Sequence, residues 1–315
     1  IPVDFNRDVD LLFVIDNSGS MGEEQTSLAA NFQRFIDVLD GIEGGLPNIH
    51  IGVVSSNVGV GPYTITACGD GDGGRLQSVP RAACDGPTDA FIADLRGTAP
   101  GERLRNYPLS QTMAETFGCI AKLGTTGCGF EQHFESMKRA LDGTNPENAG
   151  FLRPDAYLAV VFLADEDDCS AADPAVFNPA QTAISDPLGP LSSFRCTEFG
   201  LICDGGPISR SPAVYESCEP RTDSYLRTPA GYADFLRSLK VDPSLLIVAG
   251  AFGNPLPIAV GVDTDGKPEL LPSCETLAGK AVPGLRLQAL LDEFPARNTF
   301  ASICHEDLSA AVEGI

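Results

Sequence analysis

Short, almost continuously apolar segments alternate along this chain with amphipathic helical patterns, and that alternation constrains the fold more than any other feature. Residues 9–15, VDLLFVI, are apolar on both faces and rich in branched side chains, which is typical of a strand buried in a parallel sheet. Similar segments occupy residues 49–54, 157–163, 245–252 and 299–304. We therefore expect an α/β fold with a doubly wound, mostly parallel central sheet and helices on both of its faces.

Apolar residues at helical spacing predict the helices around these strands. In chain order, the apolar faces consist of Leu28, Phe32, Phe35, Ile36 and Leu39; Met113, Phe117 and Ile120; Phe130, Phe134, Met137 and Leu141; Tyr232, Phe235, Leu236 and Leu239; and Leu287, Leu290, Leu291 and Phe294. Two stretches, at about 57–108 and 170–227, interrupt the pattern and are rich in Gly, Pro, Asp and Ser. We interpret them as loop insertions, ordered by crosslinks rather than by a core, in a single domain that spans residues 1–315.

The ten cysteines predict disulfides. Their even number, the absence of a CxxC pair and the presence of only three histidines argue against a zinc site. Disulfides imply an extracellular, cell-surface or periplasmic location, and we expect that a signal or anchor has been removed before Ile1. If cysteines pair by proximity, the preferred bridges are Cys68–Cys84, Cys119–Cys128 and Cys274–Cys304, which leaves Cys169, Cys196, Cys203 and Cys218 to form two more; the sequence alone does not fix the connectivity.

The balance of charge excludes some partners. The formal net charge is -22, from 43 acidic and 21 basic residues, so the chain repels nucleic acid and anionic lipid. No apolar segment approaches the roughly 20 residues of a membrane-spanning helix, so we expect no membrane insertion of this chain. The acidity serves solubility alone, or part of it binds divalent cations.

A cluster of oxygen-bearing side chains follows the first predicted strand. Residues 13–22 read FVIDNSGSMG, so Asp16, Ser18 and Ser20 alternate in a tight loop that Gly19 and Gly22 allow to fold back. Ligands of open α/β sheets bind at the carboxyl ends of the strands, where this loop lies. One carboxylate and two hydroxyls suit Mg²⁺ or Mn²⁺, which prefer oxygen ligands.

The DNSGSM segment resembles the DxSxS signature of the metal-ion-dependent adhesion site in von Willebrand factor type A domains, such as secreted bacterial proteins and the inserted domains of integrins. The resemblance implies a Rossmann-like fold and two further ligands: Thr125 in LGTTGCGFEQ, with Thr126 as its competitor, and Asp165 in VVFLADEDD. It also implies a cation (Mg²⁺, or Mn²⁺ or Ca²⁺) that binds an acidic side chain of a protein partner without catalysis.

The family usually has Asp followed by Gly in its third loop, whereas Glu166, Asp167 and Asp168 follow Asp165 here. These carboxylates could bind a second ion such as Ca²⁺, could add charge to the first ion and weaken its attraction for an external acid, or could form a solvated acidic loop. Two weaker calcium candidates are Asp70 with Asp72, and Asp263 with Asp265; for the second pair we favour a hairpin turn.

Two other functions compete with metal-dependent adhesion. The first is a structural surface or pilus component in which the metal only stabilises the fold. The second is a serine hydrolase, because Ser20, Asp165 and His305 occur in the Ser, Asp, His order of α/β-hydrolases. That fold needs Gly two residues before the serine, where this chain has Ser18, so we expect no enzyme. We interpret His133 as a helix-surface residue and His50 as a residue of a strand.

Overall fold

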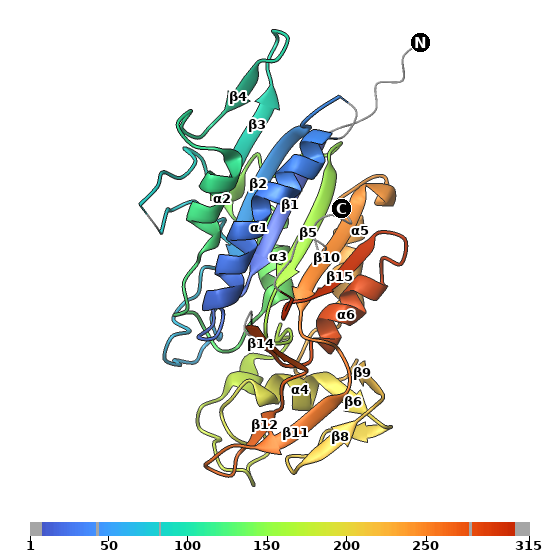
Figure 1. The fold of residues 1–315 in the computed structure, drawn as a ribbon. Coiled ribbons are helices and arrows are strands. Elements are labelled where there is room, and N and C mark those ends of the chain that lie inside the picture. The colour runs from blue at the N-terminus through green and yellow to red at the C-terminus, as the bar shows by residue number, and fades with distance from the viewer. Residues whose placement is uncertain (1–7, 42–43, 82, 277–278, 306–315) are drawn as a thin grey trace.

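The computed structural model describes residues 8–41, 44–81, 83–276 and 279–305, and in these residues a seven-stranded sheet forms the centre of the fold (Figure 1). The order of its strands is β15-β10-β5-β1-β2-β3-β4. Their bounds are β1 Asp8–Ile15, β2 Asn48–Ser55, β3 Ile92–Arg96, β4 Arg103–Arg105, β5 Tyr157–Leu163, β10 Leu246–Phe252 and β15 Asn298–Ser302. The strands from β15 to β2 are parallel, and β3 and β4 are antiparallel to their neighbours, so the prediction of a mostly parallel α/β sheet is confirmed.

Alternate residues of β1 pack into two different cores, because successive side chains of a strand point to opposite faces. Phe13 and its neighbours on the same face pack against α1 (Gly22–Gly41) and α2 (Met113–Ala121). Val14 and its neighbours pack against α3 (His133–Leu141), α5 (Pro229–Ser238) and α6 (Leu285–Asp292). The helices therefore cover both faces of the sheet, as the apolar patterns predict.

The two stretches interpreted as loop insertions contain regular structure. The first contributes β3 and β4 to the central sheet. The second contributes α4 (Phe194–Gly200), β6 (Leu201–Cys203), β7 (Gly206–Pro207), β8 (Ala213–Tyr215) and β9 (Cys218–Pro220). The strands β6, β7 and β9 form one small sheet, and β8 joins another with β11 (Ile258–Val262) and β12 (Pro268–Leu270). Figure 1 shows these small sheets beyond the carboxyl ends of the parallel strands.

Both insertions are crosslinked, as predicted, but they also bury apolar side chains, so a core orders them together with the disulfides. Phe194 and Leu201 of the second insertion pack with Ile258 of β11, and Ile92 of the first lies in the main core. The remaining described elements are the hairpin of β13 (Cys274–Thr276) and β14 (Gly279–Ala281), and the 3-10 helices η1 (Pro146–Asn148), η2 (Pro174–Phe177) and η3 (Pro243–Leu245).

All ten cysteines form disulfides. The pairs are Cys68–Cys128, Cys84–Cys119, Cys169–Cys196, Cys203–Cys218 and Cys274–Cys304. The last pair is confirmed, and so is the formation of two bridges among the four cysteines left over. The predicted pairs Cys68–Cys84 and Cys119–Cys128 are wrong. Arg81 lies against the end of α2, where its N–H donates to the carbonyl of Cys119 over 3.0 Å, so Cys119 bonds to Cys84 and not to its near neighbour in sequence.

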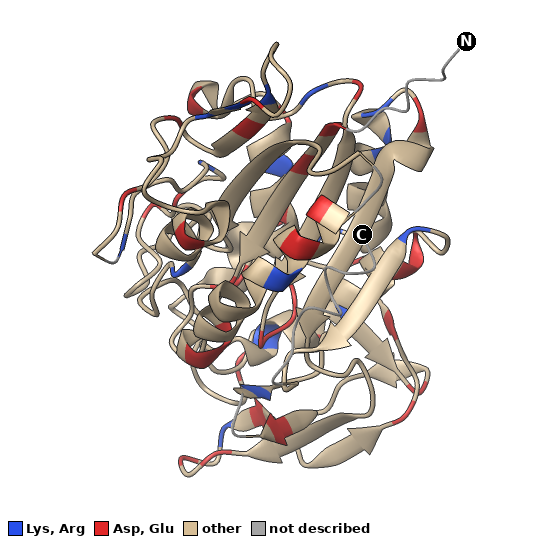
Figure 2. Cartoon of the chain, turned by 45° about the horizontal axis from the view of Figure 1, so that its top comes forward, with Lys and Arg blue, Asp and Glu red and all other residues tan. Residues whose placement is uncertain are grey.

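No helix in the described part of the chain is long and apolar enough to cross a membrane. Figure 2 shows acidic and basic residues on elements throughout the molecule, on the helices and loops of the main sheet and on the small sheets.

Candidate metal centre

The loop that follows β1 places buried oxygens at the carboxyl edge of the sheet. Asp16 and Ser18 are buried, whereas Ser20 is exposed. The Ser18 N–H donates to Oδ1 of Asp16 over 2.7 Å, which closes the turn. Among the described residues, neither Oδ2 of Asp16 nor Oγ of Ser18 has a hydrogen-bond partner. The loop therefore holds two buried oxygens that are free to accept a ligand.

The second predicted loop lies against the first, and Gln25 joins them. The side-chain amide of Gln25 donates to the carbonyls of Asp16, over 2.8 Å, and Gly124, over 3.0 Å, and its oxygen accepts from the Gly124 N–H over 3.0 Å. The methyl carbon of Thr125 lies 3.7 Å from the position that a Cβ on Gly22 would occupy. Thr125 is therefore adjacent to the first loop, and both Thr125 and its competitor Thr126 are exposed.

The third loop begins beside the first because β1 and β5 are neighbours, and the Asp16 N–H donates to the carbonyl of Leu163 over 2.9 Å. Asp165 is 4% exposed, and its Oδ1 has no hydrogen-bond partner in the described structure. Burial and the negative charge of Asp16 raise the pKa of Asp165 to about 8, although a hydrogen bond from Ser20 lowers it. The structure thus brings Asp165 within electrostatic reach of Asp16 and within hydrogen-bond reach of Ser20.

Two residues to which sequence reasoning assigned no role also lie at this site. His133 is fully buried, with Nε2 3.7 Å from Oδ2 of Asp16, so its interpretation as a helix-surface residue is wrong. Glu131 is 1% exposed, and both of its carboxylate oxygens lack a hydrogen-bond partner in the described structure. One feature of the sequence could have pointed to these two residues. Glu131 comes just before a helix that starts at this edge of the sheet, and His133 lies at its start. His50 lies in β2, as predicted.

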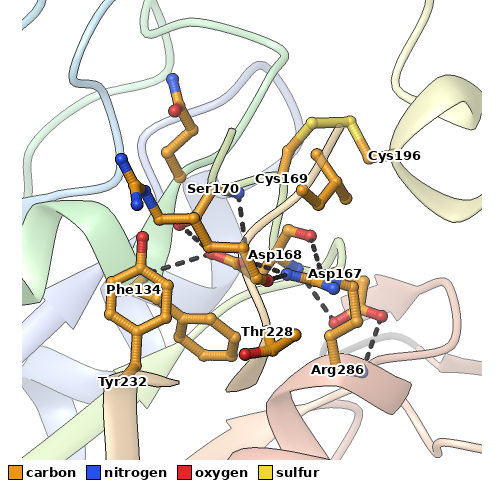
Figure 3. A network of polar contacts seen from close by, with 12 residues as sticks. Phe134, Asp167, Asp168, Cys169, Ser170, Cys196, Thr228, Tyr232 and Arg286 are labelled. Atoms are coloured by element: carbon orange, nitrogen blue, oxygen red, sulfur yellow. Dashed lines mark hydrogen bonds and ion pairs between the residues drawn. A yellow bond between two sulfur atoms is a disulfide. The ribbon is translucent and has the colours of Figure 1, made fainter. Parts of the chain in front are cut away.

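Two of the acidic residues after Asp165, Asp167 and Asp168, do not form a solvated loop (Figure 3). Asp167 accepts hydrogen bonds from the N–H groups of Arg286, over 2.8 Å, and Leu287, over 3.1 Å, and so caps the first turn of α6. Asp168 accepts from the N–H of Phe134, at the start of α3, over 3.0 Å, and pairs with the Arg286 guanidinium over 3.0 Å. Both carboxylates are buried and engaged by protein groups, so they tie α3 and α6 to the third loop.

The weaker calcium candidates have local partners. The Ser55 hydroxyl donates to Oδ2 of Asp72 over 2.5 Å. The Asp263 N–H donates to the carbonyl of Lys267 over 2.8 Å between β11 and β12, so the prediction of a hairpin turn is confirmed.

The donors of the Asp16 site fit a hard divalent cation. Buried polar atoms in proteins nearly always have hydrogen-bond partners, and a buried charge needs a compensating one. Here Oδ2 of Asp16, Oγ of Ser18 and Oδ1 of Asp165 are all buried, and within the described residues none has a partner. An all-oxygen set of this kind suits Mg²⁺, Mn²⁺ or Ca²⁺. Nowhere in the described chain do three His, Cys, Asp or Glu side chains converge closely enough to hold an ion by themselves, so a centre here depends on the hydroxyls.

A cleft of about 440 Å³ opens beside this site. It is lined by Ser20, Glu23, Glu24, Asp165, Glu166, Thr276, Gly279, Lys280, Ala281 and Val282. Its far wall is the β13–β14 hairpin, which is attached to the third loop because the Val282 N–H donates to the carbonyl of Asp165 over 2.9 Å. Ser20 and Asp165 are therefore the predicted ligands that a partner in this cleft would meet.

No family model matches the chain, and no curated protein matches it. Among solved structures, it is similar to the conserved hypothetical protein BatB from Bacteroides thetaiotaomicron, with 9% identity over 97% of this chain and 96% of that one and a TM-score of 0.36. The minor pilin PilB from Streptococcus sanguinis is 13% identical over 99% of this chain and 60% of its own, with a TM-score of 0.40. A von Willebrand factor type A protein from Catenulispora acidiphila is 14% identical over 78% of this chain and 38% of its own, with a TM-score of 0.27. Because these TM-scores lie below 0.5, none of these likenesses indicates a function for this chain.

Proposed function

We propose that this chain is an extracellular binding domain that holds a divalent cation at Asp16, Ser18, Ser20, Thr125 and Asp165 and uses it to engage a carboxylate of a protein partner. The observation that carries the proposal is the group of buried oxygens without hydrogen-bond partners, described above, at the carboxyl edge of the sheet. The five disulfides support an oxidising, extracellular location.

The residues of the site divide into a buried and an accessible part. Asp16 and Ser18 are buried below the rim, where they would hold the ion. Ser20 is exposed and lines the cleft together with Asp165 and Lys280. A bound cation would supply positive charge that attracts a carboxylate in this low-dielectric setting, and the exposed ammonium of Lys280 adds to that attraction. The partner contact we propose is therefore an Asp or Glu side chain inserted beside Ser20.

Calorimetric titration with Mg²⁺, Mn²⁺ and Ca²⁺ tests the cation site. We expect the unmodified protein to take up one ion and Asp16→Asn to lose that uptake. Asp37→Asn, which changes an exposed carboxylate on α1, is the matched control and should bind as the unmodified protein does. A protein that takes up none of the three ions at millimolar concentration would refute the proposal.

Selection from a displayed peptide library tests the partner chemistry. We expect peptides recovered in Mg²⁺ to be enriched in Asp or Glu, and we expect the enrichment to vanish in EDTA or with Ser20→Ala. Circular dichroism with and without EDTA provides the control, because the disulfides should hold the fold without the ion. Unfolding on chelation, with no cation-dependent enrichment, would instead favour a structural component whose metal only stabilises it.

A further inference from the structure

We propose that Glu131 supports cation binding at the Asp16 site. It does so as a buried carboxylate that lies outside the set of direct ligands. The inference rests on the proposed function, because it assigns a residue to the same cation. In this positioning role, Glu131 supplies negative charge that balances the positive charge of the cation. It neither ligates the cation directly nor contacts the partner.

Glu131 lies between the first and third loops of the site. Its carbonyl accepts from the Cys169 N–H, just after the acidic third loop, over 2.7 Å. On its other side, the Gln132 N–H donates to the carbonyl of Ser56 over 2.9 Å, and the Ser56 hydroxyl lies 3.4 Å from Oδ1 of Asp16. His133, two residues further on, contacts the other oxygen of Asp16. The backbone therefore fixes Glu131 at the base of the centre.

The carboxylate of Glu131 is buried and has no hydrogen bond to another described residue. It is 1% exposed, and both its oxygens lack a hydrogen-bond partner among the described residues. Burial raises its pKa well above the usual range, and the negative charges of Glu166, Asp16 and Asp165 raise it further. A buried carboxylate among other carboxylates is costly in its charged form, and a cation at the site would offset that cost.

Glu131 acts at a distance from the ion. In the described residues, no three acidic or imidazole side chains converge on one point. Glu131 therefore does not join Asp16 and Asp165 as a third carboxylate ligand of the cation. Its free oxygens can instead accept hydrogen bonds from water in the site, and its charge strengthens cation binding. The same negative charge lowers the attraction of the site for a partner carboxylate, so Glu131 favours retention of the ion over tight partner binding.

Calorimetric titration of Mn²⁺ into three variants tests the role. Removal of an outer partner of a metal site typically costs about 10-fold to 100-fold in affinity, and we expect a loss of this size for Glu131→Gln. Glu131→Asp keeps the charge and should recover most of the affinity. Asp37→Asn removes an exposed carboxylate of α1 that does not line the cleft, and we expect it to bind within about 2-fold of the unmodified protein.

Thermal unfolding without metal separates this role from a packing role. Because Glu131→Gln removes a carboxyl group that is costly to bury in its charged form, the metal-free variant should unfold at or above the temperature of the unmodified protein, while Mn²⁺ should stabilise it less. Affinity within 2-fold of the unmodified protein, or a lower metal-free midpoint in both Glu131 variants, would overturn the inference. If the unmodified protein binds no ion, the proposed function fails as well. If it binds and Glu131→Gln binds equally, only the role of Glu131 fails.

Discussion

Replacing Arg286 by Met should destabilise the fold severely, because Arg286 holds a buried carboxylate. Both Arg286 and Asp168 are fully buried, and the guanidinium donates to Oδ2 of Asp168 and to the carbonyl of Arg227 over 2.7 Å. Removing one partner of a buried ion pair typically costs about 3–5 kcal/mol. At roughly 2 cal/mol/K of unfolding entropy per residue, a loss of about 4 kcal/mol lowers the unfolding midpoint of a 315-residue chain by about 6 °C.

Scanning calorimetry or far-UV circular dichroism can follow this unfolding, since the chain has no Trp. Arg139→Met is the matched control, because Arg139 pairs with Glu135 on the surface of α3 and its side chain is 39% exposed. Such a pair contributes less than about 0.5 kcal/mol, so the control should move the midpoint by about 1 °C or less. In a double-mutant cycle, Asp168→Asn combined with Arg286→Met should lose less stability than the two single changes together. A midpoint for Arg286→Met within 2 °C of the control would show that this pair does not hold the third loop to α6.

Three further changes test the core, the loops and the crosslinks. Phe32→Ala removes a ring that is 1% exposed between β1 and α2, and should lower the free energy of unfolding by about 3–5 kcal/mol in chemical denaturation. Val38→Ala, at an exposed position of the same helix, is the control and should lower it by less than about 0.5 kcal/mol. Gln25→Leu breaks the bridge between the first two loops and should weaken Mn²⁺ binding several-fold by calorimetry; unchanged affinity would show that Gln25 does not position the site. Peptide mapping without reduction should recover Cys68 joined to Cys128, and replacing both by Ser should cost about 4 kcal/mol on the chain-entropy account of a crosslink between residues 60 apart.

The layered fold could be predicted because its signals are local. Residues 11–15 are apolar at every position, on both faces of the strand, so the sequence itself indicates burial on both faces. The small sheets could not be predicted in the same way. Strands such as β8 and β9 have three residues each, too few to show a period, and they form only because β11 or β6 lies beside them.

The candidate site was predictable in part for a similar reason. Asp16, Ser18 and Ser20 lie in one loop directly after a strand, so their joint position follows from the order of residues. The burial of Glu131 and His133 could not be predicted, because the residues that cover them come from the first and third loops.

The sequence by itself determined the strand and helix order, the first loop of oxygen donors and the presence of crosslinks, since each depends on residues close together in the chain. Only the tertiary structure decided which cysteines pair and which acids in the third loop are already engaged. It also decided that the buried carboxylate of Glu131 has no hydrogen bond to another described residue. The physical reason is that the energy of a buried charge depends on the groups around it, and at the edge of a parallel sheet those groups belong to loops separated by whole strands and helices.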